Sequence, residues 1–303
     1  EAVRMTDHAR PTVSVSDLRK TFYDESRGEV HAVDGLTFDC FPGEVFGLLG
    51  ANGAGKTTTL RMLSTVLRPT GGSATLMGHD IAREPEAVRK SLGFYSASTA
   101  LYPRLTARET IDFFTRINGY PKERVDARVS ELVERFGITE YESGRVDKLS
   151  SGMKQKVSIA RTIAHDPPVL IFDEPTVGLD VMNALEMVKV VRELKAEGKT
   201  ILYSSHIMSE VEKLCDRIGI VHRGRLLALG TLDELREATG EHYLEDVFLH
   251  YVKEAEGIAG EAEVGPVGEL EGDALEMGVV EGGVVEGGGG TLDGGPMGGA
   301  PTS

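Results

Sequence analysis

Two short segments of this chain have the composition of phosphate-binding sites. The first, GANGAGKTT, fits the pattern G-x-x-x-x-G-K-[ST] through Gly50, Gly55, Lys56 and Thr57. Its glycines let backbone N–H groups surround phosphates. The lysine can reach the β- and γ-phosphates of a nucleotide, and the threonine hydroxyl can bind Mg²⁺. The segment therefore predicts a site for a nucleoside triphosphate.

The second segment, LSSGMKQKVSIAR, covers residues 149–161. Ser150, Ser151 and Gly152 precede a run of apolar residues at helical spacing. The first N–H groups of a helix have no partner within the helix, and the helix dipole is positive at this end, so such a segment is a good anion receptor. One chain with one nucleotide site has no evident need for a second receptor of this kind.

Polar residues follow two further apolar runs. The run VLIFDEP ends in Asp173 and Glu174, and ILYSSH ends in His206. Ligands bind at the carboxyl ends of parallel strands, so we expect all three side chains at the nucleotide. Asp173 is placed to hold Mg²⁺ through water and Glu174 to polarise the attacking water. We expect His206 to contact the γ-phosphate.

The elements that position these residues alternate between strand and helix over residues 10–250. Apolar runs and alternation predict strands over 12–18, 36–41, 44–50, 168–175 and 199–206. Helical patterns predict helices over 56–67, 106–117 and 181–198. Thr106 and Glu109 have capping-box spacing, and Asp180 and Gly198 are typical of the two ends of the third helix. We expect residues of about 92–147 to form a mainly helical insertion in an α/β core.

Charge and composition divide the chain. Residues 251–303 contain 11 acidic residues and one lysine, a net charge of −10, which leaves −5 of the total −15 for residues 1–250. We expect residues 251–303 to be a Gly- and Glu-rich disordered tail, because they cannot bury enough apolar surface to offset the entropy of ordering. The weakly acidic body argues against general nucleic-acid binding. No run of 18 apolar residues and no apolar leader is present, so we expect a cytoplasmic protein.

Taken together, these motifs resemble the nucleotide-binding domain of an ABC transporter. GANGAGKTT is similar to the Walker A loop, VLIFDEP to the Walker B strand, LSSGMKQK to the family signature and VGLD, which ends in Asp180, to the D-loop. The resemblance covers residues 12–250, after an N-terminal extension over 1–11. It implies an α/β P-loop NTPase fold, the ABC ATPase head, with a RecA-like core, an antiparallel β subdomain and a helical insertion.

The resemblance assigns a role to each motif. It implies ATP binding by Phe22, Tyr23, Gly50, Ala51, Asn52, Gly53, Ala54, Gly55, Lys56, Thr57 and Thr58. It also implies catalysis by Glu174, His206 and Lys56, and binding of Mg²⁺ by Thr57 and Asp173. In this family two domains pair head to tail, as a homodimer or heterodimer. The signature residues Ser150, Ser151, Gly152 and Met153 then bind the ATP of the partner, which explains the second anion receptor.

Longer stretches around the signature and around His206 are similar to the NatA group of ABC-2-type exporters. This similarity implies an ATPase that drives export of Na⁺ or another substrate through a separate permease. The protein is then peripheral on the cytoplasmic face of the membrane. Related ATPases act on nucleic acid or ribosomes, but they usually carry two heads, coiled-coil arms or zinc motifs, which are lacking here. An intact Glu174 argues against a regulator that binds ATP without cleaving it.

The chain departs from the family pattern at three positions. Ser151 replaces the first of two signature glycines, Phe22 replaces the tyrosine that stacks on adenine, and Ala97 replaces the Q-loop glutamine. Either Ser96 or Ser98 supplies the missing oxygen through water, or Mg²⁺ binding relies on Thr57, phosphates and water alone. We favour the second reading, because a serine hydroxyl is much shorter than a glutamine side chain.

Overall fold

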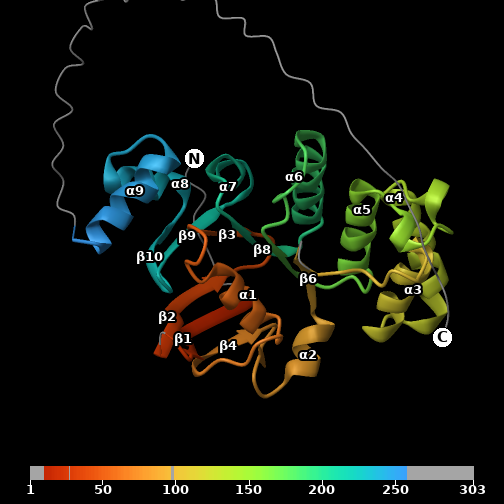
Figure 1. Ribbon diagram of the computed structural model, residues 1–303, viewed down its shortest axis with the longest axis horizontal. Helices are drawn as coiled ribbons and strands as arrows, with labels where there is room; N and C mark the ends of the chain where they lie inside the picture. The colour runs from red at the N-terminus through yellow and green to blue at the C-terminus, as the bar shows by residue number, and fades with distance from the viewer. Residues whose placement is uncertain (1–9, 27, 97–98, 258–303) are drawn as a thin grey trace, which may run out of the picture. The chain divides into compact units, whose positions relative to one another are not determined.

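The computed structural model describes residues 10–26, 28–96 and 99–257 (Figure 1). The chain divides into two compact units, Glu1–Gly260 and Glu261–Ser303, and the second lies wholly outside the described residues. The prediction of a disordered tail therefore falls largely on residues that are not described. Within the described ranges, no helix is both long enough and apolar enough to cross a membrane.

A six-stranded sheet forms the centre of the first unit. Its strand order is β10-β9-β3-β8-β7-β6, and every neighbouring pair is parallel except β9 and β10. The strands are β3 (Val45–Leu49), β6 (Leu92–Ser96), β7 (Val169–Asp173), β8 (Thr200–Ser205), β9 (Arg217–His222) and β10 (Arg225–Gly230). All residues of β3, β7 and β8 are buried, as expected for parallel strands that are covered on both faces.

A second, four-stranded sheet is antiparallel and has the order β2-β1-β4-β5. It consists of β1 (Val13–Asp24), β2 (Gly28–Cys40), β4 (Gly71–Leu76) and β5 (His79–Asp80). Its buried side chains, such as Leu18, Leu36 and Phe38, share one core with Phe46 and Leu60 of the central unit. The expected antiparallel subdomain is therefore present, and it packs next to the phosphate-binding loop.

The helices of residues 107–162 form a group beyond β6, and the other helices lie closer to the two sheets (Figure 1). They are α1 (Lys56–Leu63), α2 (Pro85–Lys90), α3 (Ala107–Ile117), α4 (Val125–Arg135), α5 (Ser151–Thr162), α6 (Val181–Ala196), α7 (Met208–Leu214), α8 (Leu232–Thr239) and α9 (Leu244–Ala255). Short 3-10 turns occupy Lys122–Arg124, Thr139–Tyr141 and Val146–Lys148. Thr106 and Glu109 form the predicted capping box, and the Asp180 carboxylate caps α6.

The structure corrects several predicted boundaries. Strand β1 continues to Asp24 rather than ending at residue 18, and β2 begins at Gly28 rather than at residue 36. Helix α1 ends at Leu63 rather than at residue 67, because Thr65 adopts a left-handed conformation with φ of +62°. Residues 92–96 belong to the central sheet as β6, so the helical insertion begins after Ser96 and not at 92. Helix α9 continues to Ala255, and its buried residues Leu244 and Val247 pack in the core, so the folded region extends past residue 250.

Candidate nucleotide-binding and hydrolysis site

Three neighbouring strands of the central sheet deliver the predicted catalytic residues to one place. Strands β3, β8 and β7 are adjacent, and they are followed by the phosphate-binding loop, by His206 and by Glu174 respectively. A cavity of about 470 Å³ opens there. It is lined by Ala32, Asn52, Gly53, Ala54, Gly55, Lys56, Thr57, Thr58 and Glu174. The three strand ends thus lie side by side, although Asp173 and His206 are not among the residues that line this cavity.

The loop that precedes α1 is shaped by close backbone contacts. Gly55 has φ of +105°, and a Cβ atom added to it would lie 2.4 Å from the carbonyl oxygen of Ala32. A Cβ on Gly50 would lie 2.4 Å from the carbonyl oxygen of Val221. Only glycine fits such distances, so these two positions let the loop pack closely against the backbone of Ala32 and of Val221.

Lys56 is the buried charge of the site. Its side chain is 3% exposed, and its Nζ donates to the carbonyl oxygens of Gly50, at 2.7 Å, and Ala51, at 3.2 Å. Glu174 Oε1 lies 3.1 Å from the same nitrogen. A buried ammonium group needs such compensation, because leaving it unpaired in a low-dielectric interior is costly. The lysine and the predicted water-activating carboxylate are therefore direct neighbours.

Asp173 and Thr57 form the second part of the site. Asp173 Oδ1 accepts hydrogen bonds of 2.9 Å from Thr57 Oγ1 and of 2.9 Å from Ser204 Oγ. These oxygen donors fit Mg²⁺, which prefers carboxylates and hydroxyls and keeps several waters. Across the described residues, no cluster of three His, Cys, Asp or Glu side chains could hold a metal alone. The chemistry of the donors thus suits Mg²⁺ bound mainly through phosphates and water.

Glu174 occupies an unusual backbone conformation. Its φ is +46°, a region that non-glycine residues visit at a cost of about 1–3 kcal/mol. The Glu174 N–H is held in place by the oxygens of Ser204, the carbonyl at 3.2 Å and the hydroxyl at 3.0 Å. Strain of this kind clusters at functional sites, where the surrounding structure holds the residue in place.

His206 lies beside the carboxylate of Glu174. Its Nδ1 is 3.5 Å from Glu174 Oε2, and among the described residues this nitrogen has no hydrogen-bond partner. A ring nitrogen beside a carboxylate, at the end of a strand, can contact a phosphate or a water that approaches Glu174. The arrangement brings one positive side chain, one carboxylate and one imidazole around a single position, which suits attack of water on a phosphate.

The signature segment lies outside this cavity. Ser150 is the N-cap of α5, and its hydroxyl accepts a hydrogen bond of 3.3 Å from the Met153 N–H. Gly152 faces the start of α6, since a Cβ there would lie 3.2 Å from the Asn183 side-chain oxygen. The same asparagine donates to the carboxylate of Asp180, and these hydrogen bonds lower the pKa of that carboxyl. The signature and the D-loop are therefore held together within one chain.

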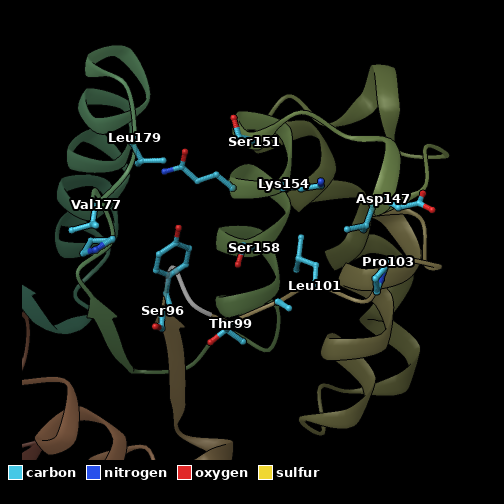
Figure 2. A pocket seen from close by; sticks show the side chains of 15 residues that line it. Ser96, Thr99, Leu101, Pro103, Asp147, Ser151, Lys154, Ser158, Val177 and Leu179 are labelled. Atoms are coloured by element: carbon cyan, nitrogen blue, oxygen red, sulfur yellow. The ribbon is translucent and has the colours of Figure 1, made fainter.

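A larger cavity, of about 580 Å³, adjoins the signature helix (Figure 2). Figure 2 shows Ser151, Lys154 and Ser158 of α5 between two walls. One wall carries Val177 and Leu179, and the other carries residues such as Leu101, Pro103 and Asp147. Its lining mixes apolar side chains with polar ones, among them Ser151, Lys154 and Ser158 of the signature helix.

Some predicted residues are not brought to the nucleotide cavity. Phe22 and Tyr23 lie on β1, with side chains 41% and 79% exposed, and do not line it. Lys20 Nζ lies 5.0 Å from the centre of the Phe22 ring. Their role in adenine binding stays a prediction. Ala97 and Ser98 are outside the described residues, whereas Ser96 is buried and pairs with Asp173 between β6 and β7.

Sequence reasoning missed two residues of the site. Ser204 bonds both Asp173 and Glu174, and the carbonyl of Ala32 forms part of the wall against Gly55. The serine pair before His206 was a usable signal, because a hydroxyl at a strand end can reach the neighbouring strand. Ala32 could not be predicted from its residue type, because it contacts the loop through its backbone carbonyl and belongs to the antiparallel sheet.

Comparisons with known proteins agree with this geometry. The ABC transporter family model matches residues 33–177. The chain is 40% identical to the ABC transporter ATP-binding protein NatA of Bacillus subtilis (strain 168) over 238 residues, covering 78% of this chain and 96% of that protein. It is 37% identical to the linearmycin resistance ATP-binding protein LnrL of the same organism, covering 75% of this chain and 73% of that protein.

A solved structure described as the ATP-binding subunit of an ABC transporter is also similar. It is 31% identical, with a TM-score of 0.72, and the match covers 80% of this chain and all of that chain. The fold and the site thus define a nucleoside triphosphatase of the P-loop class. The chain belongs to the ABC transporter family, as an ATP-binding subunit with the ATPase site of that family.

Proposed function

We propose that this chain powers an exporter by hydrolysing ATP between two ATPase domains. The two domains, identical or different, close head to tail, and each ATP lies between the phosphate loop of one domain and Ser151–Gly152 of the other. A separate permease in the membrane carries the substrate, and the chain binds it from the cytoplasmic side. The names of the similar proteins, among them a linearmycin resistance protein, support export rather than import.

The observation that supports this arrangement is the separation of two anion receptors in one chain. The nucleotide cavity is lined by Lys56, Glu174 and residues of the phosphate loop, and its described lining contains no residue of α5. The N-terminus of α5 is thus available to a phosphate that another domain presents. Closure then depends on nucleotide, because the phosphate is what joins the two surfaces.

Each residue of the nucleotide site has a separate role in the proposed hydrolysis. Lys56 and the amides of its loop balance the charge on the phosphates, and an arriving phosphate can replace Glu174 as the partner of Lys56. The released carboxylate then orients water, and His206 stabilises the γ-phosphate. Thr57 and Asp173 would hold Mg²⁺, which neutralises phosphate charge when it is bound.

Mixing two inactive variants tests the head-to-tail arrangement. Lys56→Ala destroys a chain's own ATP site, and Ser151→Asp places a negative charge where the partner's phosphate binds. Each variant alone should show almost no ATPase activity. A mixture should recover up to about one quarter of the wild-type rate, because half of the dimers pair the two variants and one of their two sites is intact. The steady-state ATPase rate measures this recovery.

The control for the charge substitution is Ser130→Asp on α4. Ser130 is also exposed, and Arg108 already donates to it, so a carboxylate there should leave ATPase activity unchanged. An inactive mixture of two folded, ATP-binding chains would contradict a site shared between two domains. Activity of Ser151→Asp alone at the wild-type level would remove the signature from the site.

Contact with the permease is expected at Tyr102, Pro103 and Leu105. Tyr102 is 53% exposed and packs on Phe113 and Phe114, whereas Leu105 is half-buried and supports the fold. Tyr102→Ala should therefore weaken binding to the membrane subunit and leave ATPase activity of the isolated chain intact. The measurement is co-purification of a multi-span membrane protein with the tagged chain from detergent-solubilised membranes.

Tyr243→Ala is the matched control, because Tyr243 is a similarly exposed tyrosine, 63% exposed, next to α9. It should leave co-purification unchanged. Two outcomes would contradict a contact with the permease and would assign Tyr102 to the packing of the helical insertion. One is an equal loss of co-purification in both variants. The other is a lower melting temperature in Tyr102→Ala alone.

A further inference from the structure

Glu210, on α7, joins two segments that carry the catalytic residues. Its Oε2 atom accepts hydrogen bonds from Tyr203 Oη at 2.8 Å, from Thr176 Oγ1 at 2.9 Å and from Ser205 Oγ at 3.2 Å. The three donors are 0%, 5% and 2% exposed, respectively. Hydrogen bonds to an ionised acceptor are about twice as strong as those between neutral groups. One carboxylate oxygen therefore holds three buried hydroxyls.

Each hydroxyl belongs to a segment next to the reaction. Thr176 follows Glu174 by two residues, and its carbonyl accepts the Leu179 N–H of the D-loop at 3.1 Å. Ser205 directly precedes His206, and its hydroxyl accepts the Ile207 N–H at 2.9 Å. These two hydrogen bonds to Glu210 thus connect the loop after β7 with the loop after β8.

Tyr203 holds the Glu210 carboxylate by a hydrogen bond from the central sheet. It lies within β8, it is fully buried, and burial together with the neighbouring charge of Glu210 raises the pKa of its hydroxyl. The hydroxyl therefore stays protonated and donates its hydrogen. With this anchor, the Glu210 carboxylate has a fixed position relative to the central sheet, and the two loops take their positions from it.

We propose that Glu210 is a positioning residue for ATP hydrolysis, which sets the distance between Glu174 and His206 by holding Thr176 and Ser205. This inference rests on the proposed roles of Glu174 and His206 and adds a residue that touches neither substrate nor Mg²⁺. Without the Glu210 carboxylate, the strained conformation at Glu174 loses part of its support, and the 3.5 Å approach of His206 to Glu174 is no longer held.

The test compares turnover with ATP affinity in the purified full chain. Glu210→Ala should lower kcat by at least about tenfold and leave KM for ATP within about threefold, because the phosphate loop is not touched. Glu210→Gln keeps an oxygen acceptor and should recover kcat to within about threefold of the wild type. Thr176→Val removes one hydroxyl at constant volume, and should lower kcat by about fivefold. If Glu210→Ala does not fold, the kcat of Thr176→Val tests the proposal in its place.

A double variant and a control separate positioning from stability. Thr176→Val in the Glu210→Ala background should cost almost nothing further, because both changes remove the same hydrogen bond. Glu212→Ala, on the same helix, only breaks the 3.0 Å ion pair with Arg236 and should leave kcat unchanged. A normal kcat in Glu210→Ala and Thr176→Val, with only a lower melting temperature, would overturn the proposal.

The variant Glu174→Gln, measured in parallel, separates failure of the catalytic role of Glu174 from failure of the positioning role of Glu210. If Glu174→Gln still hydrolyses ATP, the catalytic assignment fails, and the positioning role fails with it. If Glu174→Gln is inactive while the Glu210 variants turn over normally, only the positioning role is overturned.

Discussion

Glu174→Gln should bind ATP and fail to cleave it, with kcat reduced by at least about 100-fold. The amide keeps an oxygen that can accept from Lys56, which lies 3.1 Å from the carboxylate, so the shape of the cavity is retained. It loses the negative charge that orients and polarises the attacking water. With ATP and Mg²⁺ present, uncleaved ATP should keep two domains together, and size-exclusion chromatography should show a dimer.

The size of the effect follows from the geometry of the site. His206 is a neighbouring group that could accept a proton, but its Nδ1 lies beside Glu174 itself, 3.5 Å from Oε2, and we do not expect it to replace the carboxylate. Glu237→Gln, an exposed change on α8, is the control and should behave as wild type. Turnover in Glu174→Gln at near the wild-type rate would remove Glu174 from its role, whatever the oligomeric state.

Gly55→Ala should weaken ATP binding strongly. The new methyl group would lie 2.4 Å from the Ala32 carbonyl oxygen, and φ of +105° is strained for any residue with a side chain. The clash is with backbone and not with the end of a flexible side chain, so we expect the loop to shift and to displace Lys56, the next residue. We expect ATP affinity to fall by at least about 30-fold, as measured by titration with a fluorescent ATP analogue.

Gly43→Ala provides the matched control for backbone strain. Gly43 also has a left-handed conformation, with φ of +75°, but a Cβ atom there would meet no atom within 4 Å. Its substitution should lower the melting temperature slightly and leave ATP affinity unchanged. If Gly55→Ala binds ATP within about threefold of the wild-type affinity, then close packing against Ala32 does not shape the loop.

The chemistry of the site could be predicted from the sequence because it depends on short local patterns. A glycine-rich loop between a strand and a helix, and acids at the end of an apolar run, are recognised from a few consecutive residues and the elements that flank them. Lys56, Asp173, Glu174 and His206 were identified in this way. The helix caps at Thr106 and Asp180 were equally local, since a capping side chain bonds to a backbone only two or three residues away.

The order of the strands was decided only by the tertiary structure. Nothing local states that β8 lies between β3 and β7, yet this order brings Ser204 against Asp173 and Glu174. The same is true of β6, which periodicity placed in a helical insertion. Its short apolar run could belong to a helix or a strand, and pairing with β7 decided the outcome.

Contacts between distant segments were likewise beyond sequence reasoning. Ala32 reaches the phosphate loop from the antiparallel sheet through a backbone carbonyl, which carries no residue-specific signal. Glu210 looks like an ordinary acid in the first turn of a helix until three hydroxyls from two other segments are seen to converge on it. Local patterns thus determined which groups perform the chemistry, whereas packing between sheets and helices determined what holds those groups at their working distances.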